Sequence, residues 1–185
     1  MTQSASTARL NSLAALDGSV NTLGFVAAQG GSPATGDSDF FMNGLSQRQL
    51  FSFDLSSLPA GARIESATLE LYQSRVAGDP YGKLGNVIVD HLAYGSSLDA
   101  SDYSGGTLQG AIGTLSTSPT VEYKSVDVTT AVEGDRGAGR TLAQFRLRFS
   151  VRDSNQDRAT DLAFFSDAEL SNPGQPPQLT VRYRD

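Results

Sequence analysis

Several residue types that often carry chemistry are absent or scarce in this chain. There is no cysteine, which excludes thiol catalysis, structural zinc of the cysteine type and thiol redox switching. There is no tryptophan, the ring best suited to stacking on sugars. Histidine occurs once, as His91. No stretch approaches the roughly 20 apolar residues of a membrane span, so we expect no membrane insertion.

The charge balance is acidic, with a formal net charge of −6 and a pI near 4.7. Because phosphate binding needs a basic face, this balance argues against a nucleic-acid partner. The opening residues, MTQSASTARLNSLAALDG, lack a basic stretch followed by a long apolar run, so no signal peptide is expected in this chain. The length suits one domain over residues 1–185, with residues 1–8 as a loose lead-in.

Short alternating runs separated by Gly- and Pro-containing turns make up most of the chain. The stretch RQLFSFDLSSLPAGARIESATLELY, from Arg48 to Tyr72, reads as two strands joined by a turn, and Leu142 to Val151 is the clearest single strand. We therefore predict an all-β fold with little helix, a two-sheet antiparallel β-sandwich of jelly-roll type. Phe40 and Phe41 are expected to hold the end of a glycine-rich loop against the core. The predicted inward-facing residues are Phe51, Phe53, Leu69, Leu71, Phe145, Leu147, Phe149, Leu179, Val181 and Tyr183.

The same segments carry a resemblance to a known family. The phrase from Arg48 to Tyr72, followed by QFRLRF, DLAFFSDAEL and PPQLTVRY, resembles the DNRLRE family of bacterial extracellular β-sandwich modules over roughly Asn43 to Tyr183. The resemblance implies a secreted or cell-surface location, with the chain as a mature form or an excised domain. Some modules related to this family bind carbohydrates, including alginate, so the resemblance also implies carbohydrate binding or adhesion.

An enzymatic role is not expected. A Ser-His-Asp catalytic triad needs its histidine beside a nucleophile and a carboxylate. His91 lies instead on a predicted strand next to Asp90, which faces the other way, and a histidine there is more often a core or edge residue with a satisfied hydrogen bond. The histidine and tyrosine motifs of jelly-roll polysaccharide lyases are not recognisable. We assign no catalytic residue.

An oxygen-rich loop, DSNQDRATD, is a candidate calcium site, because Ca²⁺ prefers several hard oxygen ligands. Its candidate ligands are Asp153, Asn155, Asp157 and Asp161. The loop departs from an EF-hand, since Arg158 replaces the glycine and Phe164 the closing acid. The alternative is a hairpin turn in which Asp and Asn side chains bond their own backbone. Asp37 and Asp39 form a second oxygen-rich candidate, and the cofactor prediction stays open between none and a structural Ca²⁺.

Arginines on two predicted strands are candidate ligand-binding residues: Arg146, Arg148, Arg152, Arg182 and Arg184. If the two strands belong to one sheet, five guanidinium groups line one exposed face, which suits carboxylate or sulfate groups of an acidic polysaccharide. The alternative is a solvated face paired with Glu65, Glu70 or Glu122. Tyr72, Tyr81, Tyr94 and Tyr103 are possible stacking rings, and Tyr81 and Tyr103 lie in loops, as a binding rim would require.

Together these features predict a non-catalytic extracellular binding or adhesion module, with an acidic polysaccharide as the expected ligand. The alternative is a structural surface or filament subunit that associates with copies of itself or with a neighbouring domain. Its basis is the long polar N-terminal segment, because an extended arm can add to an exposed sheet edge.

Overall fold

The computed structural model describes residues 4–28, 33–39, 42–168 and 174–184. Strands account for 50% and helices for 12%, which confirms the all-β antiparallel prediction. The strands are β1 (Ser6–Asn11), β2 (Gly18–Asn21), β3 (Val26–Ala28), β4 (Thr35–Ser38), β5 (Ser46–Asp54), β6 (Arg63–Ala77), β7 (Val87–Leu92), β8 (Thr107–Ser116), β9 (Glu122–Asp127), β10 (Leu142–Phe149), β11 (Thr160–Phe165) and β12 (Gln178–Arg184). The helices are α1 (Pro80–Lys83) and α2 (Thr129–Gly137), and the 3-10 turns are η1 (Ala14–Leu16) and η2 (Ala100–Tyr103).

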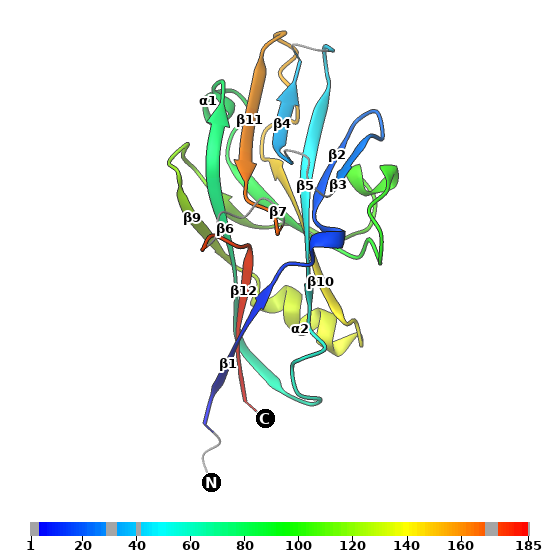
Figure 1. Ribbon diagram of the computed structural model, residues 1–185, viewed down its shortest axis with the longest axis vertical. Coiled ribbons are helices and arrows are strands. Elements are labelled where there is room, and N and C mark those ends of the chain that lie inside the picture. The colour runs from blue at the N-terminus through cyan, green and yellow to red at the C-terminus, as the bar shows by residue number, and fades with distance from the viewer. Residues whose placement is uncertain (1–3, 29–32, 40–41, 169–173, 185) are drawn as a thin grey trace.

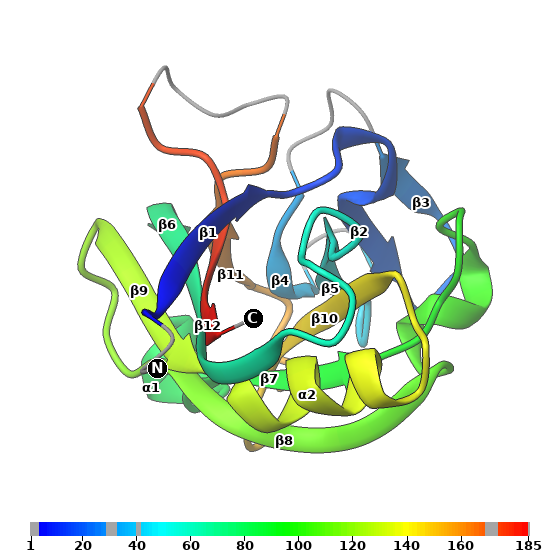
Figure 2. The ribbon, with the colours of Figure 1, turned by 90° about the horizontal axis from the view of Figure 1, so that it is seen from below.

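Backbone ladders join all these strands into one antiparallel sheet. Its main order is β1-β12-β6-β11-β4-β5-β10-β7-β8, with β2 and β3 attached beside β5 and with β9 beside β6 (Figure 1). Seen from below, the sheet is curled (Figure 2), and α2 packs against β6 and β10. The long strand β6 pairs with β11 near its end and with β12 near its start, while β9 pairs with its central part. The order β1-β12-β6-β9 is therefore one continuous surface.

The core forms where the alternating pattern predicted it. All the predicted inward residues except Tyr183 are buried, and Tyr183 packs against the edge of the same cluster. Val128, Ala131 and Val132 close one end of the core from α2. Burying such apolar side chains drives the folding of a sheet with one wet face.

The predicted loose lead-in is wrong in its boundary. Residues Ser6, Thr7 and Ala8 belong to β1, which pairs with β12 from Ser6 opposite Tyr183 to Asn11 opposite Gln178. The pairing is favoured because alternate residues Ala8 and Leu10 pack against the core while the backbone satisfies its hydrogen bonds on β12.

Two further expectations concern residues or elements outside the sheet. Phe40 and Phe41, expected to anchor a loop, lie outside the described residues. Among the helices of the described segments, none has the length and apolar character needed to cross a membrane.

Candidate functional site

Arg146 and Arg148, predicted to be exposed, instead surround a buried carboxylate. β10 lies between β5 and β7, and its register places Arg146 opposite Asp90. Asp90 Oδ2 accepts bonds from Arg146 Nη2 at 3.0 Å and Arg148 Nε at 2.9 Å, and its Oδ1 accepts from Arg148 Nη2 at 3.1 Å. The Arg146 side chain is only 3% exposed, so the prediction of an exposed guanidinium is wrong at this position.

The loop before β8 explains why Arg146 is covered. Arg146 Nη1 donates to two carbonyl oxygens of this loop, those of Asp102, at 2.9 Å, and Gly105, at 3.1 Å. Burial alone would raise the pKa of Asp90, but hydrogen bonds from Arg148, the Ala111 backbone N–H and Arg146 hold that pKa below its ordinary value. The cluster is thus a structural network that fastens a loop to the sheet, although Arg146 Nε is buried without a hydrogen-bond partner among the described residues.

The remaining predicted arginines lie elsewhere. Arg152 is exposed beyond the end of β10. Arg182 and Arg184 are on β12, and β6, β11, β4 and β5 separate that strand from β10. Both β12 arginines pair with Glu65 on β6, Arg182 at 2.9 Å. The single face of five arginines is therefore not formed, because the two strands share the sheet without being near neighbours.

Tyr81 and Tyr103 are half-buried in packing contacts and do not share a rim. The Tyr81 hydroxyl bonds to Gln73 and Ser116, and its ring meets Phe149 edge-on at 5.7 Å. Burial raises the pKa of Tyr81 to about 12. The Tyr103 hydroxyl lies 2.6 Å from Ser46 Oγ, and the Arg48 guanidinium lies 4.4 Å from the centre of its ring.

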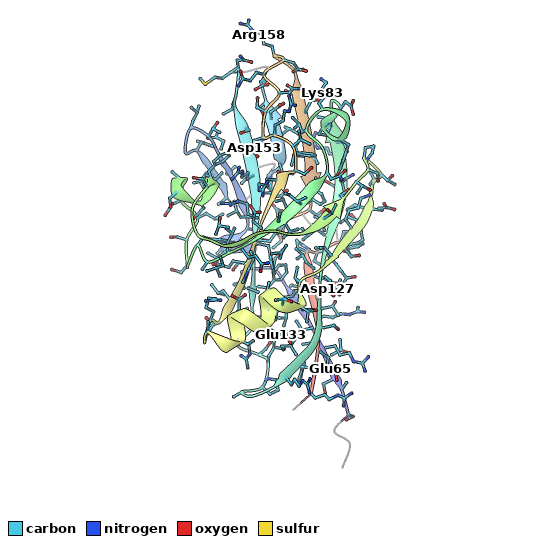
Figure 3. The ribbon with its side chains drawn as sticks, turned by 180° about the vertical axis from the view of Figure 1, so that it is seen from behind. Glu65, Lys83, Asp127, Glu133, Asp153 and Arg158 are labelled. Carbon is cyan, nitrogen blue, oxygen red and sulfur yellow. The ribbon has the colours of Figure 1, made fainter. Side chains whose placement is uncertain are left out.

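The carboxylates of the oxygen-rich loop between β10 and β11 form ion pairs with basic side chains from outside the loop. Lys83 Nζ, from α1, lies 2.8 Å from Asp157 Oδ2 and 3.1 Å from Asp161 Oδ2. Asn155 Nδ2 donates to Asp157 Oδ2 at 3.1 Å. Asp153 turns away and pairs with Arg48 at 2.6 Å. Figure 3 shows Lys83, Asp153 and Arg158 at the same end of the molecule.

The second oxygen-rich candidate lies beside the first. Asp37 accepts bonds from the backbone N–H groups of Asn155 and Asp161, each at 3.1 Å, and Asp39 accepts from Ser154 Oγ at 2.8 Å. Burial, together with the charges of Asp39 and Asp161, raises the pKa of Asp37 to about 6. Two loops that are distant in sequence therefore form one acidic cluster.

This cluster does not fit a calcium ion as it stands. Asp157 and Asp161 point their oxygens at the Lys83 ammonium, and Asp153 is engaged by Arg48. Within the described residues, no group of three or more His, Cys, Asp or Glu side chains is arranged to hold a metal ion. The arrangement matches the alternative of a turn held by side-chain bonds, such as Asp157 N–H to Asn155 Oδ1 and Ala159 N–H to Asp157 Oδ1.

We expect the melting temperature to be the same in EDTA and in excess Ca²⁺, because the Lys83 ammonium already pairs with both carboxylates at the place where the ion would bind. Differential scanning calorimetry with each additive measures this directly. The matched variant is Lys83→Met, which should melt lower than the parent in EDTA and should gain more from added Ca²⁺. A rise in the melting temperature of the parent protein with free Ca²⁺ would instead show that the ion binds the folded state.

His91 is a core residue, as the sequence indicated. Its Nε2 lies 2.9 Å and 3.0 Å from the two carboxylate oxygens of Asp135 on α2. Asp135 is fully buried and also accepts a bond from Arg140 Nε at 2.6 Å. The histidine therefore fastens α2 to β7. The absence of catalysis stays a prediction.

The outward side of β1-β12-β6-β9 gathers the candidate binding groups, and we call it the outer face. Arg9 on β1 is diagonal to Arg182 on β12, and Arg184 stands opposite Arg63 on β6. We call Arg9, Arg63, Arg182 and Arg184 the arginine patch. Among the described residues, Arg9 and Arg63 enter no ion pair, so their guanidinium groups are available to a ligand.

Two tyrosine rings lie on the same face, beyond the arginine patch. Tyr72 on β6 and Tyr123 on β9 are a cross-strand pair, with ring centres 5.3 Å apart in an edge-on arrangement. Tyr123 is 41% exposed. Sequence analysis considered Tyr72 but missed Tyr123, Arg9 and Arg63. The alternation of Thr7 and Arg9 with Ala8 and Leu10 is the signal that could have placed Arg9 outward.

A cleft borders the outer face beside β6. It has a volume of about 540 Å³ and lies between β6, β8 and the first turn of α2, with Glu65, Gln109, Ile112 and Asp127 in its wall. Figure 3 shows Asp127 near α2 and Glu65 further along β6. The outer face and the cleft are continuous through Glu65 and Asp127.

No family model matches this chain, and no curated protein matches it either. The resemblance to the DNRLRE modules therefore rests on the quoted sequence segments and stays a prediction.

Proposed function

We propose that this protein is a non-catalytic extracellular binding module that holds an acidic polysaccharide on its outer face. The observation that carries the proposal is the arginine patch, four guanidinium groups from three adjacent strands, where Glu65 pairs with two of them and Glu70 accepts a bond from Thr180 on the same face. The patch is locally basic on a chain whose formal net charge is −6. Guanidinium groups recognise carboxylate and sulfate through paired hydrogen bonds.

Two properties of the outer face support a polymer rather than a small anion. The patch and the Tyr72–Tyr123 pair lie along β6, from Arg63 to Tyr72. Nine strand steps at about 3.3 Å each place these groups roughly 30 Å apart. An extended polysaccharide can contact both, with its charged groups on the arginines and one ring face on an exposed tyrosine. The role of Tyr81 and Tyr103 in ligand binding is not part of this proposal, because their rings pack inside the molecule.

Affinity gel electrophoresis on alginate, pectin and a sulfated glycan tests the proposal. We expect retardation by at least one of these polymers that weakens as salt is added, because exposed charge pairs are screened. The variant Arg9→Gln/Arg63→Gln should bind about thirtyfold more weakly, since each of the two lost charge-assisted bonds is worth about 1 kcal/mol at an exposed site.

The matched control is Arg152→Gln, which removes an exposed arginine away from the outer face and should bind as the parent does. Equal loss in both variants would show only a general charge effect and would contradict the assignment. Absence of retardation on every acidic polymer would overturn the proposed function.

We also propose the finer features that the family resemblance implies, a two-sheet jelly-roll sandwich and a place at the cell surface. The burial of the predicted inward residues on β5, β6, β10 and β12 supports the sandwich. Fractionation of the source cells tests the location, and recovery of the protein only from the cytosol would contradict it.

A second candidate function is self-association through the N-terminal strand. The observation in its favour is that β1 is an edge strand: in the described part of the chain it pairs with β12 alone, which leaves its other backbone edge open. The exposed Arg9 opposes edge-to-edge pairing of two copies, because like charges would face each other. Light scattering across a concentration series measures the molar mass and so tests self-association. A monomer at every concentration would contradict this second function.

A further inference from the structure

The cleft beside the outer face holds polar side chains with unused hydrogen-bonding capacity. Among the described residues, the Ser66 hydroxyl, the Gln109 amide and the Thr130 hydroxyl have no hydrogen-bond partner, although all line the cleft. Asp127 Oδ1 accepts the Thr129 backbone N–H at 2.8 Å, and the Asp127 carboxylate also interacts with the Thr129 side chain. Ser66, Gln109 and Thr130 therefore offer donors and acceptors to a molecule in the cleft.

Three apolar residues line the cleft among these polar groups, and two of them, Val128 and Ala131, are buried. Ile112 on β8 is half-buried, with part of its surface against the core and part in the cleft wall. Next to it, Gly113 permits β8 to approach β9, because a Cβ at this position would meet the Val126 side chain. The wall of the cleft is thus an aliphatic patch ringed by hydroxyl, amide and carboxylate groups.

The charges around the cleft select against an anionic occupant. Among the described residues that line the cleft, Glu65 and Asp127 are carboxylates and none is basic, because Arg182 and Arg184 pair with Glu65 from outside the lining. Asp127 stays ionised, because the hydrogen bond from the Thr129 backbone N–H lowers its pKa. Its charge repels a carboxylate or sulfate but accepts hydrogen bonds from hydroxyl groups.

We propose that the cleft binds an uncharged sugar unit, whose hydroxyl groups bond Asp127, Gln109 and Thr130 while its ring packs on Ile112. This inference deepens the proposed function and rests on it in one respect: the arginine patch takes the acidic units of the same polymer. The ligand is then an acidic heteropolysaccharide that contains neutral units, rather than a polymer of uronic acid alone.

Binding in the cleft can be followed by NMR at Ile112, because the chain contains three isoleucines, Ile64, Ile88 and Ile112. Ile64 and Ile88 are buried and serve as internal references. With isoleucine methyl groups labelled, NMR titration uses neutral tetrasaccharides of glucose, mannose, galactose and xylose as separate probes. We expect the Ile112 methyl signal to shift with at least one probe below about 10 mM and the two reference signals to stay in place.

Variants locate the site without disturbing the fold. Gln109→Ala should weaken the Ile112 response about fivefold or more, because it removes one hydrogen bond to the sugar. Thr114→Ala is the matched control on the same strand, exposed and outside the cleft, and should leave the titration unchanged. Equal weakening by both variants would overturn the assignment of the cleft.

The outcomes separate this inference from the proposed function. If no neutral probe moves Ile112 while acidic gels still retard the protein, the cleft inference is wrong and the arginine patch stands. If a neutral probe moves Ile112 while no acidic polymer is bound, the proposed function fails and the inference of an acidic heteropolysaccharide fails with it. Retardation by acidic gels together with an Ile112 shift supports both.

Discussion

Replacing Asp90 by alanine should lower the free energy of unfolding by about 3–5 kcal/mol, the usual cost of leaving a buried charge without its partner. The Asp90 side chain is 2% exposed and accepts bonds from Arg146 and Arg148. The change leaves the 3% exposed Arg146 guanidinium without the carboxylate that pairs with it. The Ala111 backbone N–H, which donates to Asp90 at 2.8 Å, loses its acceptor as well. Urea denaturation measures the effect.

The control for this change is Arg182→Gln, which breaks an ion pair whose arginine side chain is 58% exposed. Exposed pairs contribute about 0–1 kcal/mol, so the control should unfold nearly as the parent does. Hydrogen exchange adds a local test, since the Ala111 amide should exchange faster in the Asp90→Ala variant. A loss below about 1 kcal/mol with unchanged exchange would show that the buried network does not hold the loop before β8.

The second large effect is expected for Phe145→Ala, with a loss of about 3–5 kcal/mol. Phe145 is fully buried on β10, directly opposite Phe51 on β5, and its ring lies 6.2 Å from that of Phe53. Because close-packed neighbours relax only partly, deletion of the ring leaves a cavity in addition to the lost burial. Thermal and urea unfolding measure the loss.

A matched phenylalanine lies on the surface. Phe25 is 68% exposed, so Phe25→Ala should change stability by no more than about 0.5 kcal/mol. Similar losses for both variants would mean that the β5–β10 contact is not the centre of the core.

The difference between the buried and the exposed arginines decides which variants can test the proposed function. Arg146 and Arg148 stabilise the fold. A variant that removes them would lose ligand binding through unfolding, whether or not either residue contacts the ligand. Arg9 and Arg63 lie on the outer face without partners among the described residues, so their removal tests binding alone.

Much of the candidate site could not be predicted from the sequence. Arg146 and Arg182 look alike there, since each alternates with apolar residues on a strand. Their environments differ because Arg146 meets Asp90 on β7 and a covering loop, whereas Arg182 meets Glu65 on an open face. Likewise, Asp157 and Lys83 are 74 positions apart, and only the packing of α1 beside the loop joins them.

The sequence by itself determined which residues face the core and that the fold is all-β, because the period-2 alternation of a strand is a local property of the chain. The turn in the DSNQDRATD loop is also local, and its position was predictable. Only the tertiary structure decided the order of the strands, and with it which charges are buried, which are paired and which remain free. That order depends on pairing between segments far apart in sequence. Local periodicity shows which face of a strand is buried but not which strand pairs with it.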